Sequence, residues 1–384
     1  MAARNICDNG AHLPFGEAGL GTCGADLGLS TNRYSVLLQN SDFFDLAKNV
    51  PFRDKTLVYN IGDYGTCDGA AAMGLMGKLI ASLKEHHGSD VQFQITHEDQ
   101  EVNDFNSLFR RLSGLIPEPP SYLQDFDNVF ALASGTNFYK QCVPADSMHI
   151  ILCLAAAHWL SGKPPVNNDN IYSFPNTDSS ARYMLEKKAS EDWETFLILR
   201  SRELKKGGLL VVSTTSNYTT TSGEVKITNE MFLSILNTLW KKFRDMGKIS
   251  NSEFVNTNMA LCDKSLALLK APFDDPNSSV RKCNLRLLSA RLVDYPCGIY
   301  TDWKQRKDKD GVDDRARFAK RFVSAHRCWS NGTFMTGLSE TRSQDEKELI
   351  VNDLYVQVED VVRNMNPECF TDQDIFSFVS IIKE

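Results

Sequence analysis

Apolar residues along this chain fall into runs whose spacing alternates between that of strands and that of helices. The run TLVYNIGDYG (56–65) predicts a buried strand that ends in a turn. In the following GAAAMGLMGKLIASLKEHH, the apolar positions recur at helical spacing. The first expected unit is therefore a strand, a turn and a helix.

This alternation continues along the chain. Strands are expected at VQFQITHED (91–99), NVFALASG (128–135) and SMHIILCLAAAHWL (147–160), and a helix at DFNSLFRRLSGLI (104–116). A second helix, EDWETFLILRSRELKKG (191–207), is expected to stop at Gly207 and Gly208 and to lead into the strand GLLVVSTTS. Strands and helices that alternate in this way predict a largely parallel sheet covered on both faces.

The alternation of expected strands and helices stops after Ser216. The segment 230–247 has a strongly helical pattern and no clear strand is expected up to about residue 280, which predicts a mostly helical insertion. A strand (285–294), two helices and a last strand, DIFSFVSIIK, follow. The charged run 304–315 is expected to be a solvated loop, with a phosphate or partner patch as the alternative.

Composition narrows the class of protein. With 384 residues, 42% of them hydrophobic, the chain can bury a large core, and its net charge of -7 offers no basic field for nucleic acid. We expect no signal peptide and no apolar run of the roughly 20 residues that span a membrane, and hence a cytoplasmic protein without membrane contact. The cysteines show no metal-ligand spacing, so neither a metal site nor a disulfide framework is predicted.

The stretch IGDYGTCDG (61–69) holds the first candidate chemistry. Nucleotides commonly dock at the carboxyl end of the first strand of an open α/β sheet, and a dinucleotide site there would need G-x-G-x-x-G. Here Asp63, Gly65 and Gly69 form D-x-G-x-x-x-G, without the close first pair of glycines that cradles a pyrophosphate. An acid beside the turn suits a ligand with an ammonium group and no phosphate, such as S-adenosylmethionine.

The next expected strand adds a second acid. Asp99 stands at its end, where a carboxylate can accept hydrogen bonds from both ribose hydroxyls. Each acid alone is equally compatible with a solvated turn. Two acids at consecutive strand ends favour a site for a nucleoside without phosphate, and we infer an S-adenosylmethionine site.

Several segments resemble the SABATH family, the methyltransferases of salicylate, benzoate, jasmonate and theobromine and their relatives. NRYSVLLQ (32–39) resembles a degraded S-Y-A-x-N-S-x-x-Q, IGDYGTCDG resembles I-A-D-x-G-x-x-x-G, and EDQEVNDFNSLF resembles N-D-L-P-x-N-D-F-N-x-L-F. VPADSMHIILCLAAAHWLS (143–161) is similar to F-P-x-x-S-x-H-x-x-x-S-x-x-x-L-H-W-L-S, and LRSRELKKGGLLVVS (199–213) to the helix and strand that follow. N-D-F-N and H-W-L-S, in order and at family spacing, are the specific part of the match.

The resemblance implies a fold, a cofactor and a division of the chain. The implied fold is an α/β, Rossmann-like class I methyltransferase domain with a mostly α-helical cap, often a homodimer, that uses S-adenosylmethionine, releases S-adenosylhomocysteine and needs no metal. The expected parts are an N-terminal segment closing over the active site (1–50), the cofactor-binding core (51–216), a helical cap insertion (217–284), and the rest of the core sheet with additional cap helices (285–384).

The resemblance also assigns site residues by position. The positions implied to contact the cofactor are Ser35, Asp63, Gly65, Asp99, Gln100, Asn137 and Phe138. Gln39, His158 and Trp159 match the positions that address the acceptor. Two departures stand out: Ser35 or Val36 stands near the serine that contacts the methionine carboxylate, and Ala155 replaces a tyrosine that faces both ligands.

The implied chemistry is an in-line methyl transfer, which requires the nucleophile, the methyl carbon and the sulfur to be collinear. A carboxylate acceptor, with an ordinary pKa of about 4, is already ionised and needs no general base. Gln39 and the Trp159 indole are then expected to aim one carboxylate oxygen at the methyl group. His158 is either a base, for a phenol or ring nitrogen, or a hydrogen-bonded structural histidine.

Other side chains have two interpretations each. Trp240, in SILNTLWKKF, either closes over the acceptor as a substrate-binding residue or packs in the cap core. Tyr300 and Trp303 either line the same cavity or anchor a turn. Cys67 is interpreted as a core residue rather than a reactive thiol, because no Lys, Arg or His adjoins it in sequence.

The expected function is formation of the methyl ester of a small hydrophobic carboxylic acid. The alternatives are N-methylation of a heterocycle or amine on the same scaffold, methylation of another acceptor such as a phenol, and a catalytically silent homologue that only binds the cofactor. A NAD-linked enzyme is disfavoured by the missing pyrophosphate glycines.

Overall fold

The computed structural model describes residues 41–52, 57–163, 169–172, 179–295, 297–370 and 374–384. Ser35, Val36 and Gln39 lie outside these residues. The strands are β1 (Tyr59–Tyr64), β2 (Phe93–Asp99), β3 (Val129–Gly135), β4 (Met148–Leu154), β5 (Leu204–Thr215), β6 (Asn217–Thr219), β7 (Val225–Ile227), β8 (Leu285–Tyr295) and β9 (Asp374–Lys383). The helices are α2 (Ser41–Lys48), α3 (Met73–His87), α4 (Phe105–Leu112), α5 (Ser179–Glu203), α6 (Glu230–Asp245), α7 (Asn251–Asn256), α8 (Leu266–Asp274), α9 (Ser279–Lys282), α10 (Gly298–Asp310), α11 (Arg315–Gly337) and α12 (Gln344–Asn364), with short 3-10 turns at Ala70–Ala72, Tyr122–Gln124 and Pro367–Phe370.

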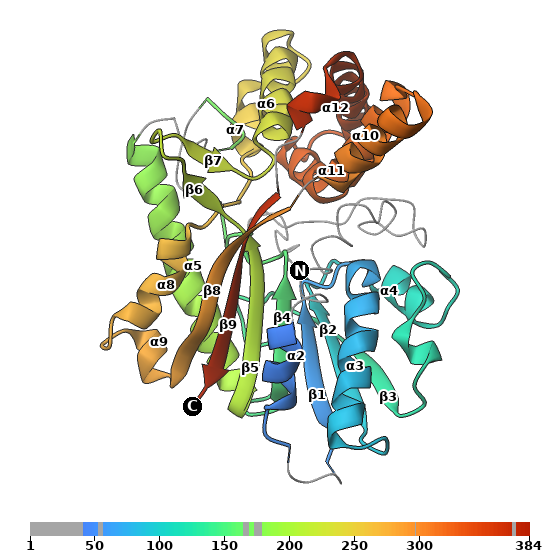
Figure 1. The fold of residues 1–384 in the computed structure, drawn as a ribbon. Helices are drawn as coiled ribbons and strands as arrows, with labels where there is room; N and C mark the ends of the chain where they lie inside the picture. The colour runs from blue at the N-terminus through green and yellow to red at the C-terminus, as the bar shows by residue number, and fades with distance from the viewer. Residues whose placement is uncertain (1–40, 53–56, 164–168, 173–178, 296, 371–373) are drawn as a thin grey trace.

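The main sheet has the order β3-β2-β1-β4-β5-β9-β8 (Figure 1). Strands β1 to β5 run parallel, whereas β9 lies antiparallel between β5 and β8. The chain moves outward from β1 to β3 and then returns to β4 on the other side of β1. Open α/β sheets bind ligands at such a reversal, in the crevice outside the carboxyl ends of the strands. The predicted parallel α/β fold is confirmed.

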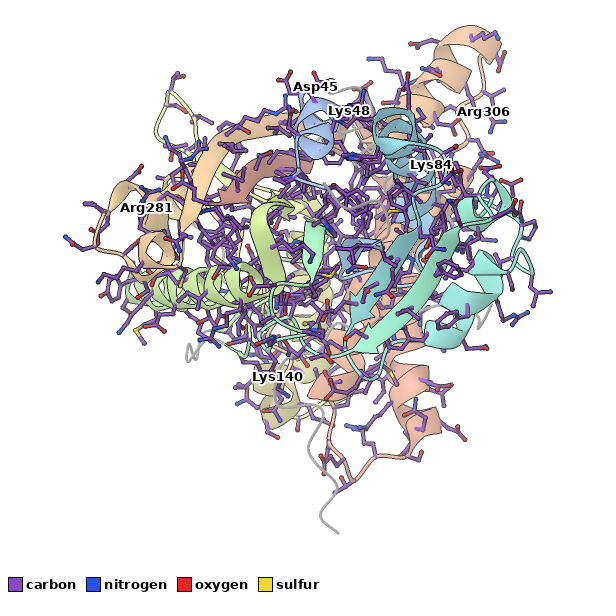
Figure 2. The ribbon with its side chains drawn as sticks, turned by 90° about the horizontal axis from the view of Figure 1, so that it is seen from below. Asp45, Lys48, Lys84, Lys140, Arg281 and Arg306 are labelled. Carbon is purple, nitrogen blue, oxygen red and sulfur yellow. The ribbon has the colours of Figure 1, made fainter. Side chains whose placement is uncertain are left out.

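Two apolar layers cover the sheet, as strand β4 shows. Ile150 and Leu152 point to a cluster that includes α2 and α3. Ile151 and Cys153, one position out of phase, point to the opposite cluster with α5, α8 and α9. This alternation is the two-residue period of a strand whose two faces are both buried. Seen from below, labelled charged residues such as Asp45 and Lys140 lie toward the outside, and both are exposed (Figure 2).

A helical cap stands over one end of the sheet. Helices α6, α7, α10, α11 and α12 gather there, beyond the carboxyl ends of β1 and β4 (Figure 1). They share an apolar cluster that is distinct from the two sheet layers and contains Trp240, Phe243 and Phe334. The predicted mostly helical cap is thus present. Helices α8 and α9, by contrast, pack on α5 and β8 at the flank of the sheet.

Three local predictions outside the cavity wall were wrong. The charged run 304–315 is helical as far as Asp310, because its acids and bases lie three or four residues apart and Ile299 and Trp303 anchor the buried side of α10. Gly311, with φ of 68°, ends that helix, so only the last part of the loop expected over 304–315 lies outside a helix. The pair β6 and β7 forms a hairpin where no strand was expected, and each strand has only three residues.

The third wrong prediction concerns the end of α5. The helix stops at Glu203 and β5 begins at Leu204, so Gly207 and Gly208 lie in the strand rather than at the helix stop. Gly207 has φ of +80°, and a Cβ there would meet the Pro51 ring at 2.6 Å. Position 207 therefore requires glycine because the backbone passes close to the segment before β1, and not because the residue caps a helix.

Candidate active site

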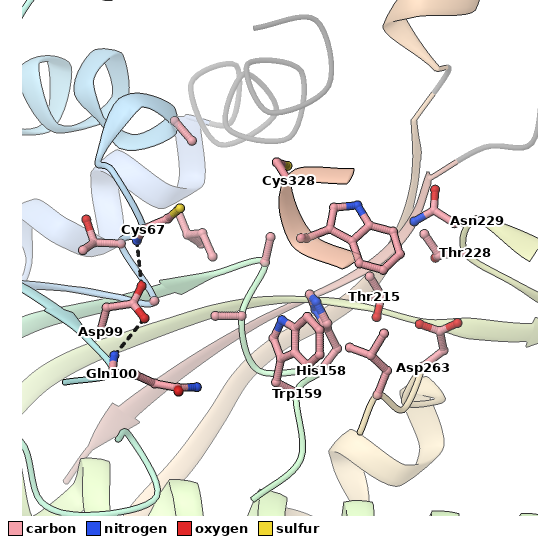
Figure 3. A pocket seen from close by; sticks show the side chains of 18 of the residues that line it. Cys67, Asp99, Gln100, His158, Trp159, Thr215, Thr228, Asn229, Asp263 and Cys328 are labelled. Carbon is pink, nitrogen blue, oxygen red and sulfur yellow. Dashed lines mark hydrogen bonds between the residues drawn. The ribbon is translucent and has the colours of Figure 1, made fainter. Parts of the chain in front are cut away.

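A cavity of about 150 Å³ lies between the carboxyl ends of the strands and the cap (Figure 3). Its walls come from the turn after β1, the end of β2, the turn after β4, the end of β5 and helices α6 and α11. The lining residues are Gly65, Thr66, Cys67, Asp68, Ala71, Asp99, Gln100, Phe138, Leu154, Ala155, Ala156, His158, Trp159, Tyr172, Thr215, Thr228, Asn229, Leu233, Leu261, Asp263, Ala325, Cys328 and Trp329.

The turn after β1 brings backbone close to the cavity. Gly65 has φ of +75°, and a Cβ at this position would stand 2.3 Å from Cβ of Ala156. The backbone N–H groups of Gly65 and Thr66 both donate to the carbonyl oxygen of Glu98, at 2.8 and 3.0 Å, which holds the turn against β2. Only glycine fits this backbone conformation together with this close approach.

Asp63 supports this turn from behind and is not among the residues that line the cavity. Its Oδ2 accepts a hydrogen bond from the Thr66 hydroxyl at 2.7 Å and lies 3.0 Å from Nδ1 of His97. Nε2 of His97 in turn lies 2.9 Å from the Tyr122 hydroxyl. All three partners are buried, so Asp63 fixes the shape of the turn. Its predicted direct contact with the cofactor stays a prediction.

Asp99 lies in the cavity wall next to Gln100, as predicted from its place at the end of β2. The backbone N–H of Cys67 donates to its Oδ2 at 2.7 Å, and that of Gln100 donates to its Oδ1 at 2.8 Å (Figure 3). Withdrawal from water raises the pKa of Asp99 to about 6, against the lowering effect of these two hydrogen bonds. Each carboxylate oxygen keeps a lone pair for a further donor, such as a ribose hydroxyl.

Phe138 forms another part of the wall, on the loop after β3. Arg200, from α5, holds this loop through hydrogen bonds to the carbonyls of Phe138 at 2.7 Å and Lys140 at 2.9 Å. The same guanidinium pairs with Glu203 at 2.7 Å, and both side chains are fully buried. Asn137 does not line the cavity, because its side-chain oxygen accepts from the backbone N–H of Tyr139 at 2.9 Å. It therefore shapes the loop that presents Phe138.

The turn after β4 presents the two residues predicted to address the acceptor. His158 and Trp159 both line the cavity. The turn begins at Ala155, whose φ is +63°, and Lys264 holds it by donating to the carbonyl of Ala157 at 2.6 Å. The predicted strand over 147–160 thus stops at Leu154, and the rest of the segment serves the site.

The half of the cavity away from Asp99 contains polar residues that the sequence did not single out. Thr215 ends β5, Thr228 and Asn229 precede α6, and Asp263 lies on the chain between α7 and α8 (Figure 3). Burial raises the pKa of Asp263 to about 6, while hydrogen bonds from Thr215, Tyr172 and Thr228 lower it. These residues are isolated in sequence and follow no motif, so only the fold brings them together.

Three aromatic candidates lie elsewhere. Trp240 is fully buried in the cap, with its ring 4.9 Å from that of Phe334, and is not among the lining residues. Its assignment to the substrate pocket stays a prediction. Trp303 donates to Asp313 at 3.1 Å and Tyr300 to Glu368 at 2.5 Å, and neither lines the cavity. The apolar period of these helices faces the cap core rather than the site.

The described residues fit an S-adenosyl nucleoside. The turn at Gly65 lets a ligand approach the backbone, Asp99 offers acceptor lone pairs at the end of the neighbouring strand, and Phe138 offers an aromatic surface. No set of three or more His, Cys, Asp or Glu side chains that could hold a metal is present in the described part of the chain. Within the same part, no helix is long and apolar enough to cross a membrane.

A family model described as "SAM dependent carboxyl methyltransferase" matches residues 46–271, more than half of the chain. The chain belongs to this family. The resemblance to SABATH enzymes is thereby confirmed, and S-adenosylmethionine is the cofactor of the family. Four of the five segments that carried the resemblance, from IGDYGTCDG to LRSRELKKGGLLVVS, lie within the matched range, whereas NRYSVLLQ (32–39) precedes it.

Curated relatives include enzymes with different acceptors. The chain is 29% identical over 186 residues to loganic acid O-methyltransferase of Catharanthus roseus, covering 46% of this chain and 45% of that protein. It is 29% identical over 171 residues to a probable 7-methylxanthine methyltransferase of Theobroma cacao (40% of this chain, 44% of that protein). It is 28% identical over 161 residues to a benzoic acid/salicylic acid carboxyl methyltransferase of Petunia hybrida (40% and 45%). The chain spans about half the length of the curated relatives it matches.

A solved structure supports the fold over the whole chain. Loganic acid methyltransferase with SAH superimposes with a TM-score of 0.72, over 97% of this chain and 98% of that chain, at 17% sequence identity. At this identity the likeness shows the fold alone: a Rossmann-like methyltransferase domain with a helical cap. The sheet order and the cap described above agree with it.

Proposed function

We propose that this chain transfers the methyl group of S-adenosylmethionine to the carboxylate of a small organic acid and so forms its methyl ester. The observation that carries the proposal is that Gly65 and Asp99 line the same cavity as His158 and Trp159, which lie between Asp99 and Asp263 (Figure 3). The family match supports the cofactor and the reaction class, and the acceptor chemistry is our inference.

The cofactor, when bound, supplies a methyl group on a positively charged sulfur. Asp99 accepts hydrogen bonds from the ribose hydroxyls, and the Gly65 turn leaves space for the rest of the nucleoside. His158 and Trp159 donate hydrogen bonds that orient the acceptor carboxylate, with Gln39, outside the described residues, as a further donor in the proposal. Positioning of this kind supplies most of the acceleration that a displacement between two held groups requires.

The chain's residues need not move a proton when the acceptor is a carboxylate, because the ordinary pKa of such an acid, about 4, leaves it ionised at neutral pH. The apolar part of the wall, with Leu233, Leu261 and Trp329, excludes water from the reacting groups. A cytoplasmic homodimer, with the four-part division of the chain given above, completes the proposal.

A second candidate is N-methylation of a heterocycle. It is favoured by two side chains in the half of the cavity away from Asp99, Asp263 and Thr215, whose oxygens can accept a hydrogen bond from a ring N–H. This candidate shares the cofactor site and differs only in the atom that is methylated.

The decisive experiment is a labelled-methyl assay with a panel of small carboxylic acids, xanthines and amines. The proposal expects label in products that are cleaved by mild alkali, as esters are, and no label with amines or xanthines. Label only in alkali-stable products would refute the ester and support nitrogen methylation. Calorimetry with S-adenosylhomocysteine identifies the remaining case: tight binding without turnover on any acceptor would indicate a silent homologue.

A further inference from the structure

One carboxylate lies in the cavity wall in the half away from Asp99, where we expect the methyl acceptor to bind. Asp263 is 8% exposed and lines the cavity on the side away from Asp99 (Figure 3). The hydroxyl of Tyr172 donates to its Oδ2 at 3.3 Å. The hydroxyl of Thr215 and the backbone N–H of Thr228 also stabilise the charged form through hydrogen bonds.

Within the part of the chain that the structure describes, these donors leave part of the carboxylate without a partner. An ionised carboxyl group has about four lone-pair sites, and three donors occupy three of them. Among the described residues, the adjacent Lys264 makes no hydrogen bond or ion pair with Asp263, and its ammonium group donates to the carbonyl of Ala157 at 2.6 Å. A buried carboxylate oxygen with an unused lone pair lowers the stability of the fold unless a ligand donates a hydrogen bond to it.

The surroundings limit what that ligand group can be. Asp263 repels a second carboxylate, so the reacting end of an acid must lie away from it, toward His158 and Trp159. Leu233, four residues after Asn229, and Leu261, two residues before Asp263, also line the cavity and offer contact only to an apolar skeleton. Asn229 is held by His326, whose Nε2 lies 3.1 Å from its side-chain oxygen, so its amide is oriented in advance.

We propose that Asp263 selects the acceptor by accepting a hydrogen bond from a hydroxyl or N–H group that the substrate carries on the end opposite its methylated carboxylate. This inference rests on the proposed ester-forming function and makes it more specific. The substrate class becomes a small hydroxylated or amino-substituted acid with an apolar frame, rather than a purely hydrophobic acid. Asp263 acts in substrate selection and takes no part in the methyl transfer.

A purely structural role for Asp263 gives a different expectation. In that role it would join the chain at Tyr172 to β5 and to the residues before α6, and its loss would weaken binding of all acceptors alike. Selection instead changes the ratio between two acceptors that differ by one donor group. A site built to accept a hydrogen bond discriminates strongly against an analogue that lacks the donor, because its buried acceptor is then left unpaired.

The test uses matched acid pairs that differ by one hydroxyl: benzoic and 4-hydroxybenzoic acid, phenylacetic and 4-hydroxyphenylacetic acid, and cyclohexanecarboxylic and 4-hydroxycyclohexanecarboxylic acid. We expect kcat/KM to favour the hydroxylated member of at least one pair by roughly tenfold or more. Asp263→Asn and Asp263→Leu should bring this ratio to about one or below, while S-adenosylhomocysteine affinity stays unchanged. Asp274→Asn is the matched control: it neutralises an exposed carboxylate that does not line the cavity, and it should keep the preference.

The same pairs are also titrated by calorimetry into the protein saturated with S-adenosylhomocysteine. If no ester forms, the proposed function fails, whereas a hydroxyl preference in binding that disappears in Asp263→Asn still supports selection. Wild-type protein that favours no hydroxylated acid in turnover or in binding overturns the inference. A preference that both Asp263 variants retain overturns it as well.

Discussion

The hydroxyl of Tyr139 donates a hydrogen bond to the carbonyl of Trp159 at 2.6 Å. This bond joins the loop after β3, which presents Phe138 to the cavity, to the turn after β4, which presents His158. The two halves of the site are therefore in direct contact through one side chain. Placement of the acceptor is expected to depend on it.

Replacement of Tyr139 by Phe tests this dependence. The variant leaves the Trp159 carbonyl without this donor, so we expect the free energy of unfolding to fall by about 1 to 2 kcal/mol. We also expect kcat to fall by roughly tenfold, because small displacements at the reacting atoms are costly. Steady-state kinetics and urea unfolding provide the two measurements. Unchanged kcat in a protein that is destabilised as expected would show that the bond serves stability alone.

Gly65→Ala is expected to abolish cofactor binding. The new Cβ would overlap Ala156 at 2.3 Å in a backbone conformation with φ of +75°, so the turn must open. Gly223, with φ of +86° and no atom within 4 Å of an added Cβ, offers the matched control. Gly223→Ala should cost about 1 kcal/mol of stability and leave S-adenosylhomocysteine affinity unchanged. Equal affinities in the two variants would mean that the close approach at Gly65 has no role in binding.

Cofactor affinity is expected to depend on pH through Asp99. Its pKa, raised to about 6 by burial, means that the carboxylate is ionised above pH 6 and takes up a proton as the pH falls below 6. Only the ionised form accepts two ribose hydrogen bonds, so the affinity for S-adenosylhomocysteine should fall toward about tenfold per pH unit below pH 6. Calorimetry from pH 5 to pH 8 measures this profile. Asp99→Asn should bind about 10 to 100 times more weakly and show a flat profile; a flat wild-type profile would argue against this role.

The buried pair Arg200 and Glu203 is expected to be essential for stability and for the shape of the cofactor site. Arg200→Met removes the counter-charge of the buried Glu203 carboxylate, at a cost of about 3 to 5 kcal/mol. It also releases the carbonyl of Phe138, which Arg200 holds at 2.7 Å. Urea unfolding should show the first effect and S-adenosylhomocysteine titration the second. In the double variant with Glu203→Leu, much of the stability should return but not the affinity.

Replacement by Phe should change the stability of the protein at Trp240 and its catalytic efficiency at Trp159. Trp240 is fully buried in the cap core, so Trp240→Phe should lower the free energy of unfolding by about 1 to 2 kcal/mol and leave the KM for the acceptor unchanged. Trp159 lines the cavity, and Trp159→Phe removes a donor from it. We expect kcat/KM to fall at least tenfold there. A changed KM for the acceptor in Trp240→Phe would instead support a direct contact between Trp240 and the substrate.

The sequence predicted the sheet because apolar runs of strand and helix length are a local property. The strand at 128–135 and the helix at 230–247 could be identified without any knowledge of their neighbours. The helix α10 could not, because Trp303 becomes its buried anchor only once α11 packs beside it. Short strands such as β6 also carry too few residues for a period to be detected.

The residues of the candidate site likewise fall into two groups, those that a sequence motif contains and those that only the fold brings together. Asp99 and Trp159 were found because they belong to contiguous motifs with fixed spacing. Asp63 belongs to such a motif too, but its buried hydrogen bonds to Thr66 and His97 show a supporting position that spacing alone does not reveal. Asp263 and Thr215 are far apart in sequence, and only the packing of the cap over β5 brings them to one cavity.

Strand β9 has a consequence for how the protein is made. It is the last of the described strands in chain order, yet it fills the gap between β5 and β8. While the ribosome is still adding the residues before Asp374, the hydrogen-bonding edge of β5 is open and β8 has no sheet to join. Nascent chains that stall or are cut before this strand therefore expose an unpaired strand edge that is prone to aggregation, and chaperones are expected to hold them until β9 emerges.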